Sequence, residues 1–158
     1  MKQSYLAQYI MDKRLCGRVF QPNSMFCCRN NSETIYKITM TDDISECFQV
    51  SKDPTLCERE ICIAQKKGFA TDDNKIDKAK LEKIMTKDLG TNAELLEDVM
   101  TNCLNGNFEK YAPPDFCNFM KMRHCVSMQI LNYCQEWNKN VECQETKKLV
   151  RECVKILT

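Results

Sequence analysis

Apolar residues recur at spacings of three and four along most of this chain, which is the period of an amphipathic α-helix. Strand-like alternation is rare, and only four glycines and four prolines interrupt the 158 residues. The pattern therefore predicts an all-α protein. The expected helices cover residues 4–15, 42–50, 54–67, 75–89, 92–104, 115–137 and 142–157. Residues 17–40 are rich in turn formers and are expected to be irregular chain.

Local signals mark the ends of several of these helices. Asp53 before Pro54 is typical of an N-cap, Gly68 of a C-terminal stop, and the segment 91–94 has the spacing of a capping box. The longest helix is expected over 115–137, and its apolar stripe makes it the central rod of the fold. That stripe contains Phe116, Phe119, Val126, Ile130 and Tyr133.

The cysteines restrict the compartment and the chemistry. There are twelve, with no Cys-x-x-Cys pair, and His124 is the only histidine. Structural zinc sites need short cysteine pairs with Cys or His partners, so zinc is the less favoured interpretation and no cofactor is expected. Six disulfides in an oxidising compartment are predicted instead. The cysteines are Cys16, Cys27, Cys28, Cys47, Cys57, Cys62, Cys103, Cys117, Cys125, Cys134, Cys143 and Cys153.

Charge and hydropathy favour neither nucleic acid nor membrane as a partner. The net charge is +1, which creates no strong field toward phosphates. Apolar runs are too short to span a bilayer. The first residues lack the apolar core of a signal peptide, so we expect the mature form of a secreted protein. Asn30 opens an N-glycosylation sequon, and the sequence does not decide whether it is used.

The cysteine spacing resembles that of insect odorant-binding proteins. The run Cys57-Glu-Arg-Glu-Ile-Cys62 is followed by Gly68 and by Asp72-Asp-Asn-Lys-Ile-Asp-Lys-Ala-Lys-Leu81. Forty residues then separate Cys62 from Cys103, and eight separate Cys125 from Cys134. With six extra cysteines, the chain is similar to the enlarged Plus-C subfamily. Over residues 28–134 the resemblance implies a disulfide-rich bundle of about six to eight helices around an apolar cavity. A single domain over 1–158 is implied, with extensions at 1–50 and 138–158 tied on by the extra disulfides.

The family joins its cysteines first to third, second to fifth and fourth to sixth. On this chain the resemblance implies Cys28–Cys62, Cys57–Cys125 and Cys103–Cys134, with Cys27 as an alternative to Cys28. Cys57 and Cys62 would point about 140° apart on an ideal helix, which predicts a bend or a helix end between them. The pairing of the others stays open, namely of Cys16, Cys27, Cys47, Cys117, Cys143 and Cys153.

The function implied by the resemblance is that of a secreted carrier and not an enzyme. It would reversibly bind small hydrophobic molecules, such as odorants or pheromones, in sensory lymph and deliver them to an olfactory receptor, as a monomer or weak dimer. Nine methionines suit adaptable apolar contact. The lining candidates, each of which could instead be ordinary core, are Leu81, Ile84, Met85, Leu96, Met100, Phe116, Phe119, Met122, Val126, Ile130 and Trp137. Tyr111, Tyr133 and Trp137 are candidate polar contacts.

Several alternatives stay open at this point. His124 invites a pH-switch hypothesis, although a structural role on a helix with ample solvated surface is favoured. The run Phe26-Cys27-Cys28-Arg29 resembles the active-site stretch of secreted phospholipases A2, but the histidine–aspartate pair that such enzymes need does not follow it. A disulfide-rich interaction or toxin-like protein without a ligand, and a lipid-transfer-like carrier, are the remaining alternatives.

Overall fold

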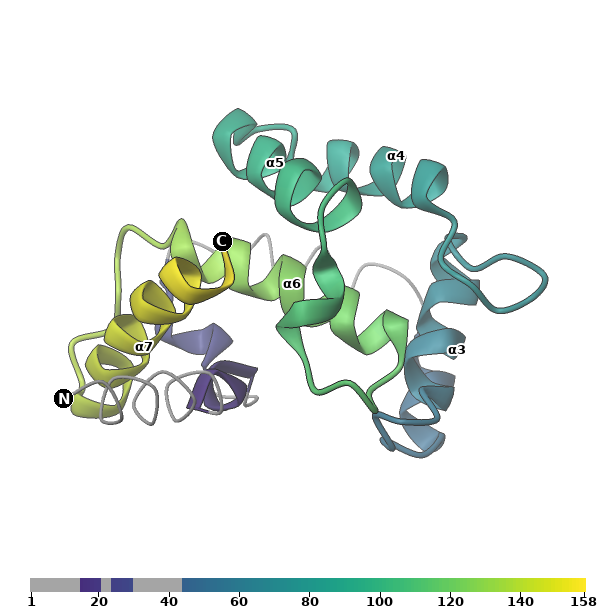
Figure 1. Cartoon of the computed structure of the whole chain (residues 1–158), viewed down its shortest axis with the longest axis horizontal. Coiled ribbons are helices and arrows are strands. Elements are labelled where there is room, and N and C mark those ends of the chain that lie inside the picture. Colours follow the sequence, from purple (N-terminus) through teal and green to yellow (C-terminus); the bar gives the residue numbers. More distant parts are fainter. Residues whose placement is uncertain (1–14, 21–23, 30–43) are drawn as a thin grey trace, which may run out of the picture. The chain divides into compact units, whose positions relative to one another are not determined.

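The computed structural model describes residues 15–20, 24–29 and 44–158. In these ranges the chain is helical, and extended pairing is limited to two isolated bridges, Cys28 to Trp137 and Ala70 to Ile76. The α-helices of the described part are α3 (Glu58–Lys67), α4 (Lys78–Leu89), α5 (Ala93–Val99), α6 (Asn118–Asn132) and α7 (Val141–Leu157) (Figure 1). Shorter helical turns are η1 (Cys16–Phe20), η2 (Met25–Cys27), η3 (Ser45–Gln49), η4 (Met100–Leu104) and η5 (Phe108–Tyr111). The all-α prediction is confirmed. The helix expected over 4–15, except for Leu15, and the sequon at Asn30 lie outside the described residues.

All twelve cysteines form disulfides, as predicted, and these fall into two groups of three. The chain divides into two compact units, one made of residues 1–32 and 127–158 and the other of residues 33–126. We call them the terminal unit and the central unit. The terminal unit holds Cys16–Cys153, Cys27–Cys143 and Cys28–Cys134, and the central unit holds Cys47–Cys62, Cys57–Cys117 and Cys103–Cys125. Each disulfide therefore closes within one unit. The single-domain organisation implied by the resemblance stays a prediction.

The three pairs implied by the resemblance are wrong. Cys28 does not reach Cys62, because backbone hydrogen bonds hold it beside the segment after α6. The Arg29 N–H donates to the Glu136 carbonyl at 2.9 Å, and the Asn138 N–H donates to the Cys27 carbonyl at 2.7 Å. This pairing of segments places Cys28 against Cys134, with their Cα atoms 5.7 Å apart, within the range that a disulfide spans. The corrected partners are Cys47 for Cys62, Cys117 for Cys57, Cys103 for Cys125 and Cys134 for Cys28.

In the central unit, α3 begins later than the capping signal predicts. The Asp53 carboxylate accepts hydrogen bonds from the N–H and the hydroxyl of Thr55, at 2.9 and 2.6 Å, and so organises a separate turn. Cys57 follows in the left-handed conformation, with φ of 59°, and α3 starts only at Glu58. A helix end between Cys57 and Cys62 was one of the two predicted ways to bring their side chains into position, and it is confirmed.

Glycines follow two helical segments, and the one after α3 lies where the sequence predicts a helix end. Gly68, with φ of 89°, closes α3 and donates its N–H to the Ala64 carbonyl at 2.9 Å. Gly106 follows η4, where a Cβ atom would lie 2.5 Å from the Thr101 carbonyl oxygen. A larger residue at this position would therefore push the chain away from the preceding turn.

Side-chain caps begin α4 and α5. The Asp77 carboxylate accepts from the Lys80 N–H at 3.1 Å, and the Asn92 side-chain oxygen accepts from the Leu95 N–H at 3.2 Å. The capping box predicted on Thr91 thus lies one residue too early, because Asn92 reaches the N–H three residues ahead. The last turn of the predicted helix 92–104 is the wider π-type turn η4.

The central helix α6 is shorter than the predicted 115–137. At its start, the Cys117 N–H donates to the Pro54 carbonyl at 2.9 Å and not to a preceding helical turn. At its end, residues after Asn132 leave the helix, and Trp137 forms the bridge to Cys28 instead. The pairing with another part of the chain overrides the helical period in this segment.

In the terminal unit, η1 packs against α7. The Asn140 side-chain oxygen caps α7 by accepting from the Cys143 N–H at 2.7 Å. Val19 on η1 and Val150 on α7 are fully buried, and the disulfide Cys16–Cys153 ties the same two elements together. In this unit, packing and disulfides thus hold together two parts of the chain that are distant in sequence, an arrangement that we call a clasp.

Candidate functional site

The disulfides of the central unit are interlocked. Taken in chain order, its six cysteines are joined first to third, second to fifth and fourth to sixth. This is the order that the resemblance to insect odorant-binding proteins implies, on a set that runs from Cys47 to Cys125 instead of from Cys28 to Cys134. The three bonds tie η3 to α3, the start of α3 to the segment before α6, and η4 to α6. They link η3, α3, α6 and η4 covalently, whereas α4 contains no cysteine.

The implied frame includes Cys134 because the eight residues between Cys125 and Cys134 match the spacing in that family. The fifth and sixth cysteines of the central unit, Cys117 and Cys125, are separated by one residue fewer. A better signal was present. No other cysteine interrupts the six of the central unit along the sequence, whereas the implied frame left out Cys47 and Cys117.

The eleven candidate lining residues do not all lie in one unit. Ile130 and Trp137 belong to the terminal unit, and the others belong to the central unit. Buried members are Leu81, Met85, Phe119, Met122, Val126, Ile130 and Trp137. Half-buried members are Ile84, Leu96, Met100 and Phe116. The half-buried members of the central unit keep apolar surface available for contact with another molecule. A role in ligand binding stays a prediction for all eleven residues.

A second apolar group surrounds the disulfide Cys57–Cys117. Its buried members are Cys57, Ala64 and Phe119, and the rings of Phe69 and Phe119 lie with centroids 6.3 Å apart. Half-buried side chains packed against it are Ile61, Phe69, Ala70, Ile76, Cys117 and Met120. Sequence reasoning overlooked most of these residues. Phe69 and Ala70 follow the end of α3, and Ala70 pairs with Ile76 in an isolated bridge, so neither shows a helical period.

Two charged residues of the central unit are buried, which the sequence pattern did not reveal. Glu60 on α3 keeps 8% of its surface exposed and pairs with the half-exposed Arg123 of α6 at 2.5 Å. Lys121, also on α6 and 8% exposed, donates from Nζ to the Pro114 carbonyl at 3.1 Å. Buried charges are usually paired, so Glu60 satisfies the usual rule, whereas Lys121 is bonded to a neutral group.

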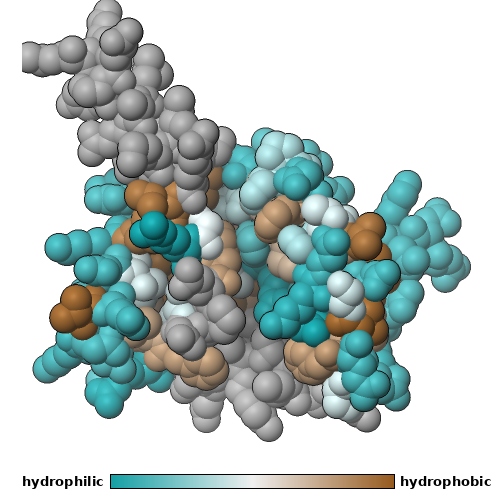
Figure 2. All heavy atoms as spheres, turned by 90° about the horizontal axis from the view of Figure 1, so that it is seen from below, coloured by the Kyte–Doolittle hydropathy of each residue, from teal (hydrophilic) through white to brown (hydrophobic). Residues whose placement is uncertain are grey.

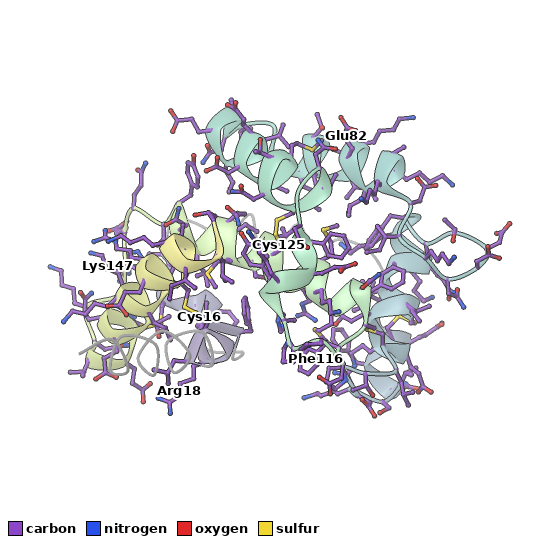
Figure 3. All side chains as sticks on the ribbon, viewed as in Figure 1. Cys16, Arg18, Glu82, Phe116, Cys125 and Lys147 are labelled. Atoms are coloured by element: carbon purple, nitrogen blue, oxygen red, sulfur yellow. A yellow bond between two sulfur atoms is a disulfide. The ribbon has the colours of Figure 1, made fainter. Side chains whose placement is uncertain are left out.

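His124 is less exposed than predicted. Its ring contacts the edge of the Phe116 ring, with centroids 5.9 Å apart, and Phe116 lies in the segment that leads into α6 (Figure 3). The pKa of His124 is lowered to about 4, mainly by burial and to a smaller extent by the charge of Arg123, although a hydrogen bond with the Tyr111 backbone opposes this shift. The imidazole is therefore neutral at physiological pH.

The candidate polar contacts are mostly enclosed. Tyr111 keeps 3% of its surface and Trp137 keeps 8%, while Tyr133 is half-buried. Tyr111 lies in the central unit and the other two in the terminal unit. An open hollow on α4 is lined by exposed side chains of that helix alone, namely Ala79, Glu82, Lys83, Thr86 and Lys87. It lacks facing walls and offers no enclosed site.

Comparisons with known proteins do not place the chain in a family. No protein-family model, no curated protein and no solved structure matches it.

Neither a candidate metal site nor a membrane-spanning helix occurs among the residues that the structure describes. Within residues 15–20, 24–29 and 44–158, no group of three or more His, Cys, Asp or Glu side chains could hold a metal ion. None of the helices described in those ranges is long and apolar enough to cross a membrane. The six disulfides indicate an oxidising compartment.

Proposed function

We propose that this protein is a secreted carrier that reversibly binds small hydrophobic molecules through the apolar interior of its central unit. The observation that carries the proposal is the interlocked order of Cys47–Cys62, Cys57–Cys117 and Cys103–Cys125 in an all-helical unit. That order agrees with the pairing that the resemblance to insect odorant-binding proteins implies. Through the same resemblance, the proposed ligands are semiochemicals and the proposed recipient is an olfactory receptor.

The physical logic links the disulfides to binding. A carrier must keep apolar surface incompletely packed, which costs stability of about 24 cal/mol per Å³ of void. Covalent links that restrict the unfolded chain offset such a deficit. In the central unit, half-buried apolar side chains on α4, α5 and η4 are Ile84, Leu96 and Met100. Met100 adds a flexible thioether that adapts to guests of different shape.

The expected affinity is moderate. Removing roughly 300 Å² of ligand surface from water gives a gross gain of about 7.5 kcal/mol. Immobilising the ligand and ordering side chains consume part of this gain, so a dissociation constant on the order of micromolar requires good shape complementarity.

Two measurements test the proposal. One is native mass spectrometry before and after solvent extraction, and the other is displacement of the fluorescent probe N-phenylnaphthylamine. The oxidised protein is expected to take up the probe and release it to apolar competitors. Ile84→Glu should weaken uptake at least about tenfold, because it places a charge among half-buried apolar groups. Ala79→Glu, at an exposed position of the same helix, is the matched control and should leave uptake unchanged. Oxidised, folded protein that takes up no probe would contradict the proposal.

A second candidate function is that of a secreted interaction protein, and exposed apolar side chains in the terminal unit favour it. Phe26 and Val141 are 75% and 74% exposed, and they lie close in sequence to the two ends of the disulfide Cys27–Cys143. Figure 2 shows one face of the molecule, on which hydrophilic side chains prevail and apolar ones form small separate patches. Absence of probe uptake together with loss of a partner complex in Phe26→Ser would favour this second function.

A further inference from the structure

Lys121 differs from the other basic groups in its part of α6. Arg123 is paired with Glu60 at 2.5 Å, and His124 is neutral because its pKa is lowered to about 4. The Lys121 ammonium is bonded to the Pro114 carbonyl at 3.1 Å, and among the described residues it has no acidic partner within ion-pair distance. Lys121 is therefore the basic group of this stretch whose charge is not compensated.

The environment of Lys121 makes this feature unusual. An ammonium carries three N–H donors, and the Pro114 carbonyl uses one of them. The residue keeps only 8% of its surface exposed. Lysines so enclosed are rare unless they are paired with an acidic group, because removing the charge from water is costly. An anionic oxygen arriving with a ligand would supply the missing partner.

The position of Lys121 also connects it to apolar surface. It lies in the first turn of α6, four residues after Cys117, and its backbone N–H donates to the Cys117 carbonyl at 3.0 Å. Residues four apart share a face of a helix, so the lysine stem leaves α6 on the side of the disulfide Cys57–Cys117. That disulfide belongs to the apolar group with the half-buried side chains Ile61, Phe69 and Met120. The helix spacing thus places a charged residue on the same side as an incompletely buried apolar cluster.

We propose that the Lys121 ammonium binds the carboxylate of an apolar ligand whose chain contacts the cluster around Cys57–Cys117. The preferred ligands would then be long-chain carboxylic acids and not neutral compounds of the same length. This inference rests on the proposed carrier function, and it names the ligand class for it. Lys121 acts as a binding residue through a charge-assisted hydrogen bond, and no covalent bond forms.

The experiment compares tetradecanoate with tetradecanol, which share a chain and differ in the head group. The wild-type protein at neutral pH should bind tetradecanoate about tenfold or more tightly than tetradecanol, as measured by displacement of N-phenylnaphthylamine. Lys121→Met should reduce this preference to near unity with little change for tetradecanol. Lys121→Arg should retain it, and Lys83→Met, which removes an exposed lysine of α4, should leave it intact.

The outcomes separate the inference from the carrier function. Equal binding of both compounds by the wild-type protein, a comparison that needs no variant, would overturn the inference and leave the carrier function standing. A preference that persists in folded Lys121→Met would also overturn it. Absence of binding for both compounds and for the probe would overturn the carrier function and the inference together.

Discussion

The two units of this molecule use the same number of disulfides in opposite ways. In the terminal unit they are nested, since Cys16–Cys153 encloses Cys27–Cys143, which encloses Cys28–Cys134. In the central unit each loop overlaps the next. Nested bonds fasten two chain segments side by side, and once the innermost has formed, each further bond closes only a short additional ring. Overlapping bonds instead fix several helices relative to one another.

This difference suggests a division of roles. The terminal unit brings residues near both ends of the described chain together as a clasp, with η1 packed on α7. The central unit carries the buried ion pair Glu60–Arg123, the buried Lys121 and most of the half-buried apolar side chains. A rigid frame around incompletely packed apolar surface suits ligand binding, whereas a clasp suits stability.

The largest expected effect comes from removing one disulfide in each unit. Replacing Cys57 and Cys117 by alanine should lower the free energy of unfolding by about 4 kcal/mol and abolish probe uptake, because the bond closes a long loop in the buried apolar cluster. Replacing Cys16 and Cys153 should cost about 2 to 3 kcal/mol and preserve uptake. Denaturant unfolding and probe titration measure both. Equal loss of uptake in the two variants would remove the distinction between the units.

Acid should weaken the central unit through His124. The folded pKa of about 4 lies below the usual 6.5, so the neutral form is favoured in the folded state. The contribution of neutral His124 to the free energy of unfolding is fully present above pH 6.5. It is lost as pH falls toward 4, by up to about 3 kcal/mol, because the unfolded chain takes up the proton first. Thermal unfolding of the wild type and of His124→Gln across this range isolates the contribution. The pH dependence should be shallower in the variant, and identical slopes would show that His124 does not contribute.

The buried ion pair gives a smaller effect in the same unit. Arg123→Met should cost about 1 to 3 kcal/mol, since it leaves the buried Glu60 carboxylate without its partner, although the half-exposed arginine limits the loss. Lys66→Met breaks the exposed contact with Glu46 and is the matched control, with an expected cost below about 0.5 kcal/mol. Chemical denaturation of both variants makes the comparison, and similar costs would mean that burial of Glu60 does not matter.

The smallest effect is expected at the surface of the terminal unit. Phe26→Ser should change stability by less than about 0.5 kcal/mol and leave probe uptake unaltered, because the ring is 75% exposed. Thermal unfolding with probe titration checks both readouts. Loss of probe uptake in this variant would assign ligand binding to the terminal unit and contradict the division of roles between the two units.

The sequence predicted the helical class and several helix ends because these depend on local chemistry. Gly68 and the helix break near Cys57 are examples, since each follows from neighbouring residues. The predicted disulfide partners were wrong because pairing depends on which distant segments meet. Hydrogen bonds between segments more than a hundred residues apart bring Cys28 next to Cys134, where the disulfide forms. No local spacing encodes that contact.

The burial of single charged residues was missed for the same reason. Lys121 and Glu60 are charged residues on helices, and contacts with distant or irregular parts of the chain accompany their burial. Glu60 of α3 pairs with Arg123 of α6, and Lys121 bonds to the Pro114 carbonyl. His124 shows the same error, because it packs against the ring of Phe116 on a helix expected to have ample solvated surface.

Hydrogen exchange of the oxidised, full-length protein with and without N-phenylnaphthylamine tests the central claim most directly. The two units are compared peptide by peptide in one sample. Added protection should be confined to peptides within residues 44–126, with those of α7 unchanged. Protection confined to the terminal unit, or none in either unit at saturating probe, would contradict the assignment of ligand binding to the central unit.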